Sequence, residues 1–258
     1  MSTIANAVQG PYLKGIALSE PPRMKLTIVQ TGAVPAHLQP QFNDYPLMFR
    51  QMFETTGEGL SFGDVDAQAE ALPDPAALDG IVITGSPAGV YEDHAWLPPL
   101  RDFIRRAYQN GTPMLGVCFG HQIMADALGG EVQKSDKGWG LGRHTYRVTR
   151  QAPFLANAPE TLSVACSHQD QVIVVPEAAD VFLASDFAPH AGLVYRNGRA
   201  MSVQPHPEFE DSYATALVEM RRGKAPEPVI ETALGSMETA SDSQKLREMI
   251  RGFFDSTR

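Results

Sequence analysis

The sequence predicts an α/β fold with a mostly parallel central sheet that carries helices on both faces. Two observations lead to this prediction. Through the first half of the chain, short apolar and β-branched runs alternate with amphipathic helical segments, which is typical of doubly wound parallel sheets. The second half offers many short strands separated by turns, which indicates an antiparallel extension of that sheet.

The elements of the first half follow from residue type and spacing. The run at 25–30 is dense in β-branched residues, and 33–46 reads as a loop with three prolines. A helix at 47–53 and another at 96–108 each carry apolar residues on one face. Further strands are expected at 60–67, weakened by acidic residues, and at 80–84, which reads as a buried strand.

The stretch 113–130 organises the rest of the chain. Residues 114–117 predict a buried strand, and the following residues predict a helix that ends at Gly129 and Gly130. Cys118 lies between strand and helix with a glycine two residues away on either side, which favours a sharp turn that presents its thiol at a helix N-terminus. The helix dipole there favours a thiolate. The alternative interpretation is that Cys118 is a small buried hydrophobe.

After residue 130 the expected strands are short, and helices close the chain. The predicted strands lie at 131–132, 142–150, 161–167, 172–175, 181–185, 192–196 and 201–203. Helices are expected from residue 209 up to a break at 223–228, and again at 244–254. We expect residues 24–258 to form one domain.

Composition excludes several classes of protein. The 258 residues are 43% hydrophobic and carry a formal net charge of −9, so a protein that binds nucleic acid over its whole surface is not expected. Two cysteines make no disulfide framework, and no apolar run is long enough for a membrane span. We therefore expect a cytoplasmic location, with residues 1–23 as a disordered extension that lacks the features of a secretory signal.

Two further stretches carry chemistry. Ser167, His168, Gln169 and Asp170 follow one expected strand, and a Gln-Pro-His-Pro-Glu run at 204–208 follows the last one. A cysteine nucleophile needs a base, and the base needs a third group that fixes its orientation. His206 and Glu208 supply both from one proline-flanked turn.

These motifs together resemble the class I, or triad, glutamine amidotransferase family. The resemblance rests on Gly-Val-Cys-Phe-Gly-His-Gln at 116–122 and on the run at 204–208, and it extends from about residue 25 to 208. The loops at 83–87 and 167–170 fall where that family has an oxyanion loop and a substrate-side loop. The resemblance implies a three-layer α/β/α fold of flavodoxin-like character.

The resemblance also implies roles for individual residues. Cys118 would be the nucleophile, His206 the base and Glu208 the orienting acid. The backbone N–H of Phe119 would form one half of the oxyanion hole, and the loop of Gly85 and Ser86 would form the other, through the N–H of Ser86. The residues that would contact bound glutamine are Gln122, Ser167 and His168. No metal or cofactor is implied.

The chain departs from the family pattern at two positions. Ser86 stands where the family usually has glycine, which keeps the backbone donor but narrows the allowed φ. Pro205 stands where an aromatic residue usually precedes the histidine, and the triad residues are unaffected.

Substrate and partner stay open at this point. The Gly-rich turn at 136–142 resembles a stand-alone branch related to GMP synthase glutaminases that includes γ-glutamyl peptidases. The substrate would be glutamine, with ammonia passed to a separate synthase, or a γ-glutamyl amide cleaved by this chain alone. Trp139 in that turn is expected to be a buried anchor or a cap on the substrate pocket.

Two other classes of function remain as alternatives. The first is a metallohydrolase, because His168 with Asp170 and His206 with Glu208 have ligand-like spacing, although Cys118 would then have no role. The second is a catalytically silent regulatory module on the same fold.

Cys166 lies beside Ser167 and is expected to be a core residue.

Overall fold

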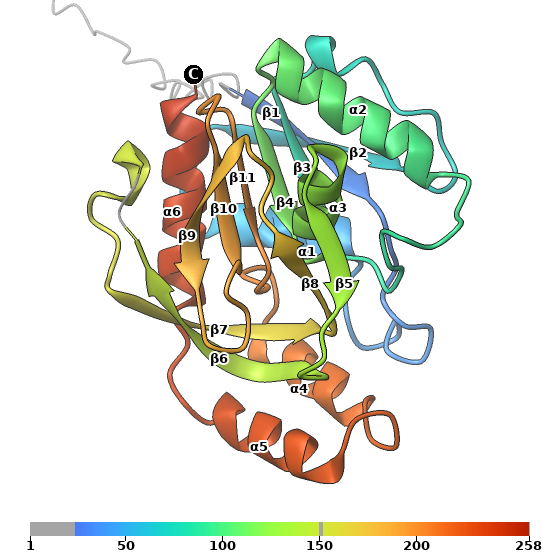
Figure 1. Ribbon diagram of the computed structural model, residues 1–258, viewed down its shortest axis with the longest axis vertical. Helices are drawn as coiled ribbons and strands as arrows, with labels where there is room; N and C mark the ends of the chain where they lie inside the picture. The colour runs from blue at the N-terminus through green and yellow to red at the C-terminus, as the bar shows by residue number, and fades with distance from the viewer. Residues whose placement is uncertain (1–23, 150–151, 258) are drawn as a thin grey trace, which may run out of the picture.

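A mixed sheet forms the centre of the computed structural model, which describes residues 24–149 and 152–257. The extension predicted over residues 1–23 lies outside the described residues. Within the described ranges this sheet has nine strands (Figure 1). Their order across the sheet is β2 (Leu60–Asp66), β1 (Met24–Gln30), β3 (Gly80–Ile83), β4 (Met114–Val117), β11 (Ala200–Val203), β10 (Gly192–Tyr195), β9 (Ala179–Ala184), β6 (Gly140–Val148) and β7 (Thr161–His168).

The first five strands in this order run parallel, and the remaining pairs are antiparallel. This confirms the parallel core and the antiparallel extension. One assignment was wrong, because β11 was predicted to belong to the extension. It pairs antiparallel with β10 but parallel with β4, since the tight reversal after β10 turns the chain back into the direction of the core strands. β11 is therefore the junction between the two parts of the sheet.

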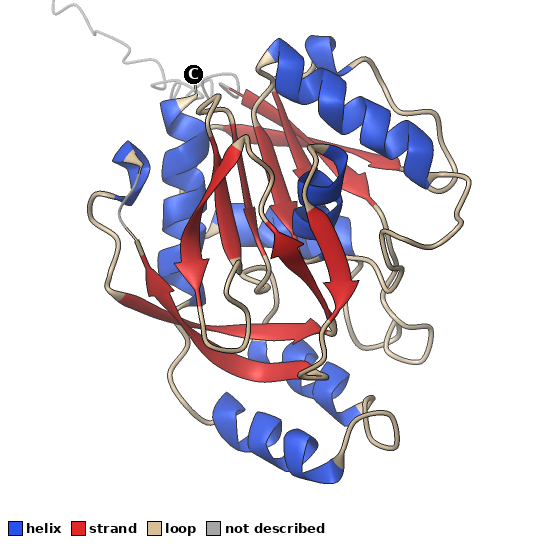
Figure 2. Ribbon diagram, in the orientation of Figure 1, coloured by secondary structure: helices blue, strands red, loops and turns tan. Residues whose placement is uncertain are grey.

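Helices cover both faces of the parallel core (Figure 2), as expected for three α/β/α layers. Leu26 and Ile28 of β1 point to one face, where α1 (Tyr45–Glu54) and α6 (Ser243–Ser256) pack. Val29 points to the other face, where α2 (Leu97–Asn110) and α3 (Phe119–Ala127) pack. The period of two along the strand thus separates the two cores.

Helix α1 begins earlier than predicted, because the sequence analysis assigned residues up to 46 to a loop. Asp44 caps the helix by accepting a hydrogen bond from the Leu47 N–H at 2.9 Å. Pro46 is compatible with the first helical turn, where its missing N–H is not needed. The proline therefore belongs to the first turn of the helix and not to the loop.

Two predicted strands lie outside the main sheet. β5 (Glu131–Lys134) and β8 (Asp170–Val174) form a separate antiparallel pair, whereas the sequence analysis placed both in the extension. Val132 and Val172 are buried with the residues of α3 and do not extend the sheet edge. Burial of these two valines against the helix explains the separate pair. Elsewhere the chain forms two 3-10 helices within the described ranges, η1 (Pro75–Ala77) beside α2 and η2 (Pro153–Leu155) beside α6.

Two helices pack across the outer end of the sheet, on β6 and β7 (Figure 1). α4 (Asp211–Glu219) was predicted from residue 209, but α5 (Glu227–Met237) was not predicted. Its only buried side chains are Ile230 and Ala233, so the apolar pattern is weak, and Pro228 reads as a break although it stands in the first turn. Within the described ranges no helix is both long and apolar enough to cross a membrane.

Candidate active site

Cys118 occupies a strained turn between β4 and α3. Its φ of 54° and ψ of −103° lie outside the regions that residues with a side chain usually adopt, and among the described residues it is the only non-glycine with positive φ. Strain of this kind persists only where the surroundings over-determine the backbone. Here the Cys118 N–H donates to the Val203 carbonyl at 2.9 Å, and the Gly120 N–H donates to the Thr84 carbonyl at 3.1 Å.

The two glycines around Cys118 are required by close packing. A Cβ on Gly116 would lie 2.6 Å from the Met124 sulfur, and a Cβ on Gly120 would lie 2.9 Å from the Ile83 carbonyl carbon and closer still to its oxygen. Gly120 does not have a positive φ, so space and not backbone freedom selects glycine there. The helix can thus start directly against the end of β3.

His206 and Glu208 follow β11, which is the strand next to β4. Parallel neighbours end at the same edge of a sheet, so the residues after β11 come beside Cys118. His206 Nδ1 lies 2.7 Å from Glu208 Oε1, and both side chains are buried. The imidazole stacks on Phe209 with 3.9 Å between ring centroids and 6° between planes. The ring is therefore fixed by a carboxylate at one nitrogen and by an aromatic face.

The electrostatic surroundings of His206 favour its protonated form. Burial by itself lowers the pKa of this imidazole, but the Glu208 carboxylate and the charge and hydrogen bond of Cys118 raise it to about 10. Glu208 Oε2 is buried and has no hydrogen-bond partner within the described ranges, so the carboxylate depends on His206 for compensation. The arrangement suits an imidazolium that faces a thiolate.

The loop after β3 is held from behind by two buried threonines. The Gly85 carbonyl lies 3.2 Å from the hydroxyl oxygens of both Thr31 and Thr84, and Thr31 also donates to the Thr84 carbonyl at 2.9 Å. In a trans peptide the N–H points opposite to the carbonyl, so the Ser86 N–H faces away from the threonines. A Cβ on Gly85 would lie 3.3 Å from His206 Cε1 and 3.8 Å from Cys118 Cβ. This peptide is therefore adjacent to the cysteine and histidine.

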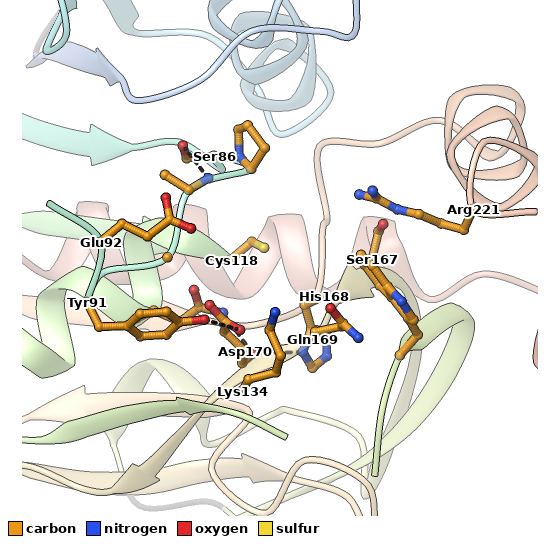
Figure 3. A pocket seen from close by; sticks show the side chains of 15 residues that line it. Ser86, Tyr91, Glu92, Cys118, Lys134, Ser167, His168, Gln169, Asp170 and Arg221 are labelled. Atoms are coloured by element: carbon orange, nitrogen blue, oxygen red, sulfur yellow. Dashed lines mark hydrogen bonds between the residues drawn. The ribbon is translucent and has the colours of Figure 1, made fainter. Parts of the chain in front are cut away.

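Two cavities meet at Cys118. The first has a volume of about 120 Å³ and is mostly polar (Figure 3). Its lining is Ser86, Pro87, Ala88, Gly89, Tyr91, Glu92, Cys118, Gln122, Lys134, Trp139, Ser167, His168, Gln169, Asp170 and Arg221. The second has a volume of about 290 Å³ and is lined by Ala33, Pro35, Tyr45, Gly85, Ser86, Pro87, Cys118, Ser167, His206, Phe209, Leu217, Met220 and Arg221.

The three residues predicted to contact substrate all line the first cavity. The Gln122 side-chain amide donates to the Asp170 carbonyl at 2.9 Å and to Gln204 Oε1 at 3.1 Å. His168 Nδ1 lies 3.0 Å from the Asp170 carbonyl, and burial lowers the pKa of its ring to about 3, so His168 is neutral at pH 7. Ser167 Oγ is buried without a hydrogen-bond partner in the described part of the chain.

Ser167 and His168 belong to β7, which extends one residue beyond the expected strand at 161–167, so the motif begins within the strand and not in a loop after it. They pair with Leu141 and Gly140 of β6, so the antiparallel ladder continues to the rim of the cavity. A strand holds these side chains more firmly than a loop would. The chain then reverses at Gln169 into β8.

Four charged or polar residues in the first cavity lie outside every motif identified from the sequence. They are Tyr91, Glu92, Lys134 and Arg221. The Tyr91 hydroxyl donates to Asp170 Oδ1 at 3.1 Å, and burial raises the pKa of the Asp170 carboxyl. None belongs to a motif, because Tyr91 and Glu92 come from the segment between β3 and α2, Lys134 from β5 and Arg221 from the turn after α4. Only the tertiary fold brings them together.

The structure shows where Trp139 and Cys166 lie relative to the two cavities and the core. Trp139 is half-buried and lines the first cavity, with the Arg221 guanidinium 4.3 Å from its ring centroid, so it lies at the pocket and not only in the core. Cys166 is buried, and burial raises the pKa of its thiol to about 12. It is a core residue, and it forms no disulfide with Cys118. Within the described ranges no three His, Cys, Asp or Glu side chains gather closely enough to hold a metal ion.

Comparison with known proteins identifies the family to which the chain belongs. A family model described as glutamine amidotransferase class-I matches residues 48–219. The chain is 27% identical over 217 residues to gamma-glutamyl peptidase 4 of Arabidopsis thaliana, covering 81% of this chain and 86% of that protein. It is 35% identical over 129 residues to a glutamine-hydrolyzing GMP synthase of Aquifex aeolicus, but spans only 24% of that protein's length.

A solved structure supports the fold. The crystal structure of a glutamine amidotransferase from Thermotoga maritima superposes with a TM-score of 0.71 at 21% sequence identity. The match covers 90% of this chain and 99% of that one. It includes the mixed sheet with a parallel core and an antiparallel extension.

Proposed function

Since the chain belongs to the class I glutamine amidotransferase family, we propose that it hydrolyses a γ-glutamyl C–N bond, with Cys118 as nucleophile, His206 as acid and base, and Glu208 as the orienting carboxylate. One observation carries the proposal. The turn after β4 and the turn after β11 bring a strained cysteine beside a buried histidine–glutamate pair. The same pair of strands positions both turns.

In the first half of the proposed reaction, the Cys118 thiolate attacks the γ-carbonyl carbon and a C–S bond forms. The C–N bond then breaks, and the protonated His206 gives its proton to the departing nitrogen. The pKa of about 10 means that His206 carries this proton at neutral pH. Glu208 stabilises the imidazolium and fixes which nitrogen faces the cysteine.

In the second half, a water molecule attacks the γ-glutamyl thioester. Neutral His206 takes a proton from the water, the C–S bond breaks, and glutamate leaves. The thiolate and imidazolium are restored. Each half passes through a tetrahedral oxyanion, for which we propose the backbone N–H groups of Ser86 and Phe119 as donors.

The oxyanion proposal rests on the orientation of two peptides. The threonine pair behind Gly85 turns the Ser86 N–H away from itself, on a peptide adjacent to Cys118. The Phe119 N–H belongs to the first turn of α3, where N–H groups have no partner inside the helix. Losing one such donor costs about 3 kcal/mol of activation free energy in related chemistry.

The charges in the first cavity suit the amino-acid end of a γ-glutamyl compound. That end carries one ammonium and one carboxylate, and the cavity lining offers the carboxylates of Glu92 and Asp170 together with the ammonium of Lys134. The predicted contacts Gln122, Ser167 and His168 line the same space. We propose that the ammonium lies near Asp170 and the carboxylate near Lys134.

The acceptor of the released nitrogen is a separate question. An ammonia-accepting synthase partner and hydrolysis by this chain alone use the same chemistry. The alignment covers 86% of gamma-glutamyl peptidase 4 but 24% of the GMP synthase, so the likeness to the peptidase extends over most of that protein.

The test is turnover by the purified protein. Glutamine, γ-glutamyl dipeptides and glutathione are incubated separately, and released glutamate, ammonia or amine is measured, with Cys118→Ala as the control. Turnover that disappears in Cys118→Ala supports the proposal. No turnover of any substrate, together with a Cys118 thiol that does not react with iodoacetamide, would favour a catalytically silent module.

A further inference from the structure

We propose that the departing half of the substrate is an apolar amino acid, whose side chain occupies the second cavity and whose carboxylate pairs with Arg221. The substrate class would then be a γ-glutamyl amide of an apolar amino acid, and not glutamine itself. This inference rests on the proposed function. It concerns the leaving group, which the triad chemistry alone does not specify.

The position of His206 decides which cavity receives the departing group. Both cavities have Cys118 in their lining, but His206 lines only the second one. The side chain that protonates the departing nitrogen must lie next to that nitrogen. The glutamyl half therefore extends into the first cavity, and the departing half extends into the second.

The second cavity is much larger than an ammonia molecule. Its volume is about 290 Å³, compared with about 120 Å³ for the first cavity. A water molecule, which is similar in size to ammonia, occupies about 30 Å³, and a cavity of about 150 Å³ is enough to hold benzene. The second cavity can thus hold a leucine-sized or phenylalanine-sized group.

The walls of the second cavity are largely apolar. Away from Cys118 they are formed by Ala33, Pro35, Tyr45, Phe209, Leu217 and Met220. The Tyr45 hydroxyl accepts a hydrogen bond from Tyr213 at 3.2 Å, so its polar end is engaged, and burial raises the pKa of Tyr45 above its usual value. A polar or charged side chain would find little compensation there, whereas an aliphatic or aromatic one would be desolvated favourably.

Arg221 supplies the charge that a leaving amino acid would need. It lines both cavities, its Nε is buried without a hydrogen-bond partner, and it has no carboxylate partner in the described part of the chain. Burial lowers the pKa of the guanidinium, and its described contact is the face of Trp139. Figure 3 shows Arg221 reaching toward the space before Cys118 from the side opposite Tyr91 and Glu92.

The two charged ends of a γ-glutamyl dipeptide thus have separate partners. Lys134, Glu92 and Asp170 lie on the side of the glutamyl amino acid, and Arg221 lies at the junction with the second cavity. Hydrolysis consumes one water, breaks the γ-glutamyl C–N bond and releases glutamate and the free amino acid. The proton from His206 ends on the amino nitrogen of that amino acid.

The first experiment compares kcat/KM for γ-glutamyl-leucine, γ-glutamyl-glycine and glutamine. A single methylene in an apolar pocket changes kcat/KM by roughly 10-fold or more. We expect γ-glutamyl-leucine to exceed both other substrates by at least about tenfold. Met220→Trp, which fills the second cavity from a half-buried position, should reduce this preference. Its fold is checked by circular dichroism.

The second experiment tests the carboxylate contact with γ-glutamyl-leucine and γ-glutamyl-leucinamide. Arg221→Gln should reduce the acid-to-amide ratio of kcat/KM by about tenfold, the usual order for a charge-assisted hydrogen bond. Arg196→Gln is the matched control, because Arg196 is exposed, pairs with Asp180 and lies outside both cavities. Its ratio should equal that of the unmodified protein.

The outcomes separate the two proposals. Cys118-dependent turnover with equal or higher kcat/KM for glutamine would overturn the apolar leaving group and leave the proposed function standing. An acid-to-amide ratio that Arg221→Gln does not change would overturn the carboxylate contact. No Cys118-dependent turnover of any γ-glutamyl compound would overturn the proposed function, and this inference with it.

Discussion

Alanine at position 120 would place a methyl group where the backbone of β3 already lies. The Cβ would be 2.9 Å from the Ile83 carbonyl carbon and closer to the carbonyl oxygen, whereas real Cβ atoms essentially never come nearer than 3.0 Å. β3 is an inner strand, with β1 on one side and β4 on the other, so it cannot move away. The start of α3, and with it Cys118, must shift instead.

The cost follows from two opposing effects. Overpacking of a rigid site costs about 3 kcal/mol at the upper end of the usual range, and the higher helix propensity of alanine returns about 1 kcal/mol. We expect Gly120→Ala to lose about 2 kcal/mol of unfolding free energy, which corresponds to a melting temperature lower by about 4–8 °C for a chain of this size. Because Cys118 shifts as well, iodoacetamide should alkylate it more slowly.

The assay is urea unfolding followed by circular dichroism, with Gly235→Ala as the control. Gly235 lies in α5, and a Cβ there would meet nothing within 4 Å, so only the propensity effect remains. That variant should gain about 0.5–1 kcal/mol. A Gly120→Ala protein as stable as the unmodified one, with unchanged alkylation of Cys118, would refute the role assigned to close packing.

Three further predictions concern the site and its surroundings. Iodoacetamide should modify Cys118 and leave Cys166 unmodified in the folded protein, because burial raises the pKa of Cys166 to about 12. Peptide mass spectrometry identifies the labelled thiol, and labelling of Cys166 in the folded protein would contradict its assignment as a core residue. Thr84→Val should lower kcat by roughly 10-fold or more, because the Gly85 carbonyl loses a buried hydrogen-bond donor that orients the Ser86 N–H. Thr84→Ser keeps the hydroxyl and should keep most of the activity, so equal kcat for the two variants would count against this positioning role. Burial lowers the pKa of His121 to about 3, so the folded protein keeps this side chain neutral, whereas the unfolded chain protonates it below pH 6.5. The free energy of unfolding should therefore fall by about 2 kcal/mol between pH 7.5 and pH 5 because of this residue, and urea unfolding of His121→Asn should show a correspondingly weaker pH dependence.

The parallel core was predictable because its signals are local. The runs at 26–29, 80–83 and 114–117 consist of apolar and β-branched residues and are buried, and a strand that is buried on both faces needs no other information. The turn at Cys118 was predictable for a related reason. Its two glycines flank the cysteine within one short motif, which indicates a sharp turn even though Gly120 makes its close approach to the distant Ile83.

The extension and the cavities depend on contacts between distant segments. Nothing local in 131–134 or 170–174 indicates that these strands pair with each other and leave the main sheet. Arg221 has the same difficulty, because it follows α4 in a turn and reaches Cys118 only through the packing of that helix on β7. The parallel pairing of β11 with β4 required knowing which strand it would join.

The place of β11 has a consequence for how the chain is made. Residues 200–203 fill the gap between β4 and β10, so a growing chain exposes the open edge of β4 until these residues have been synthesised. An open strand edge can pair with other chains, which makes this interval sensitive to aggregation. The same strand carries the histidine and glutamate into position, so the thiol has no partner during synthesis. The proposed catalytic residues come together in the step that closes the sheet.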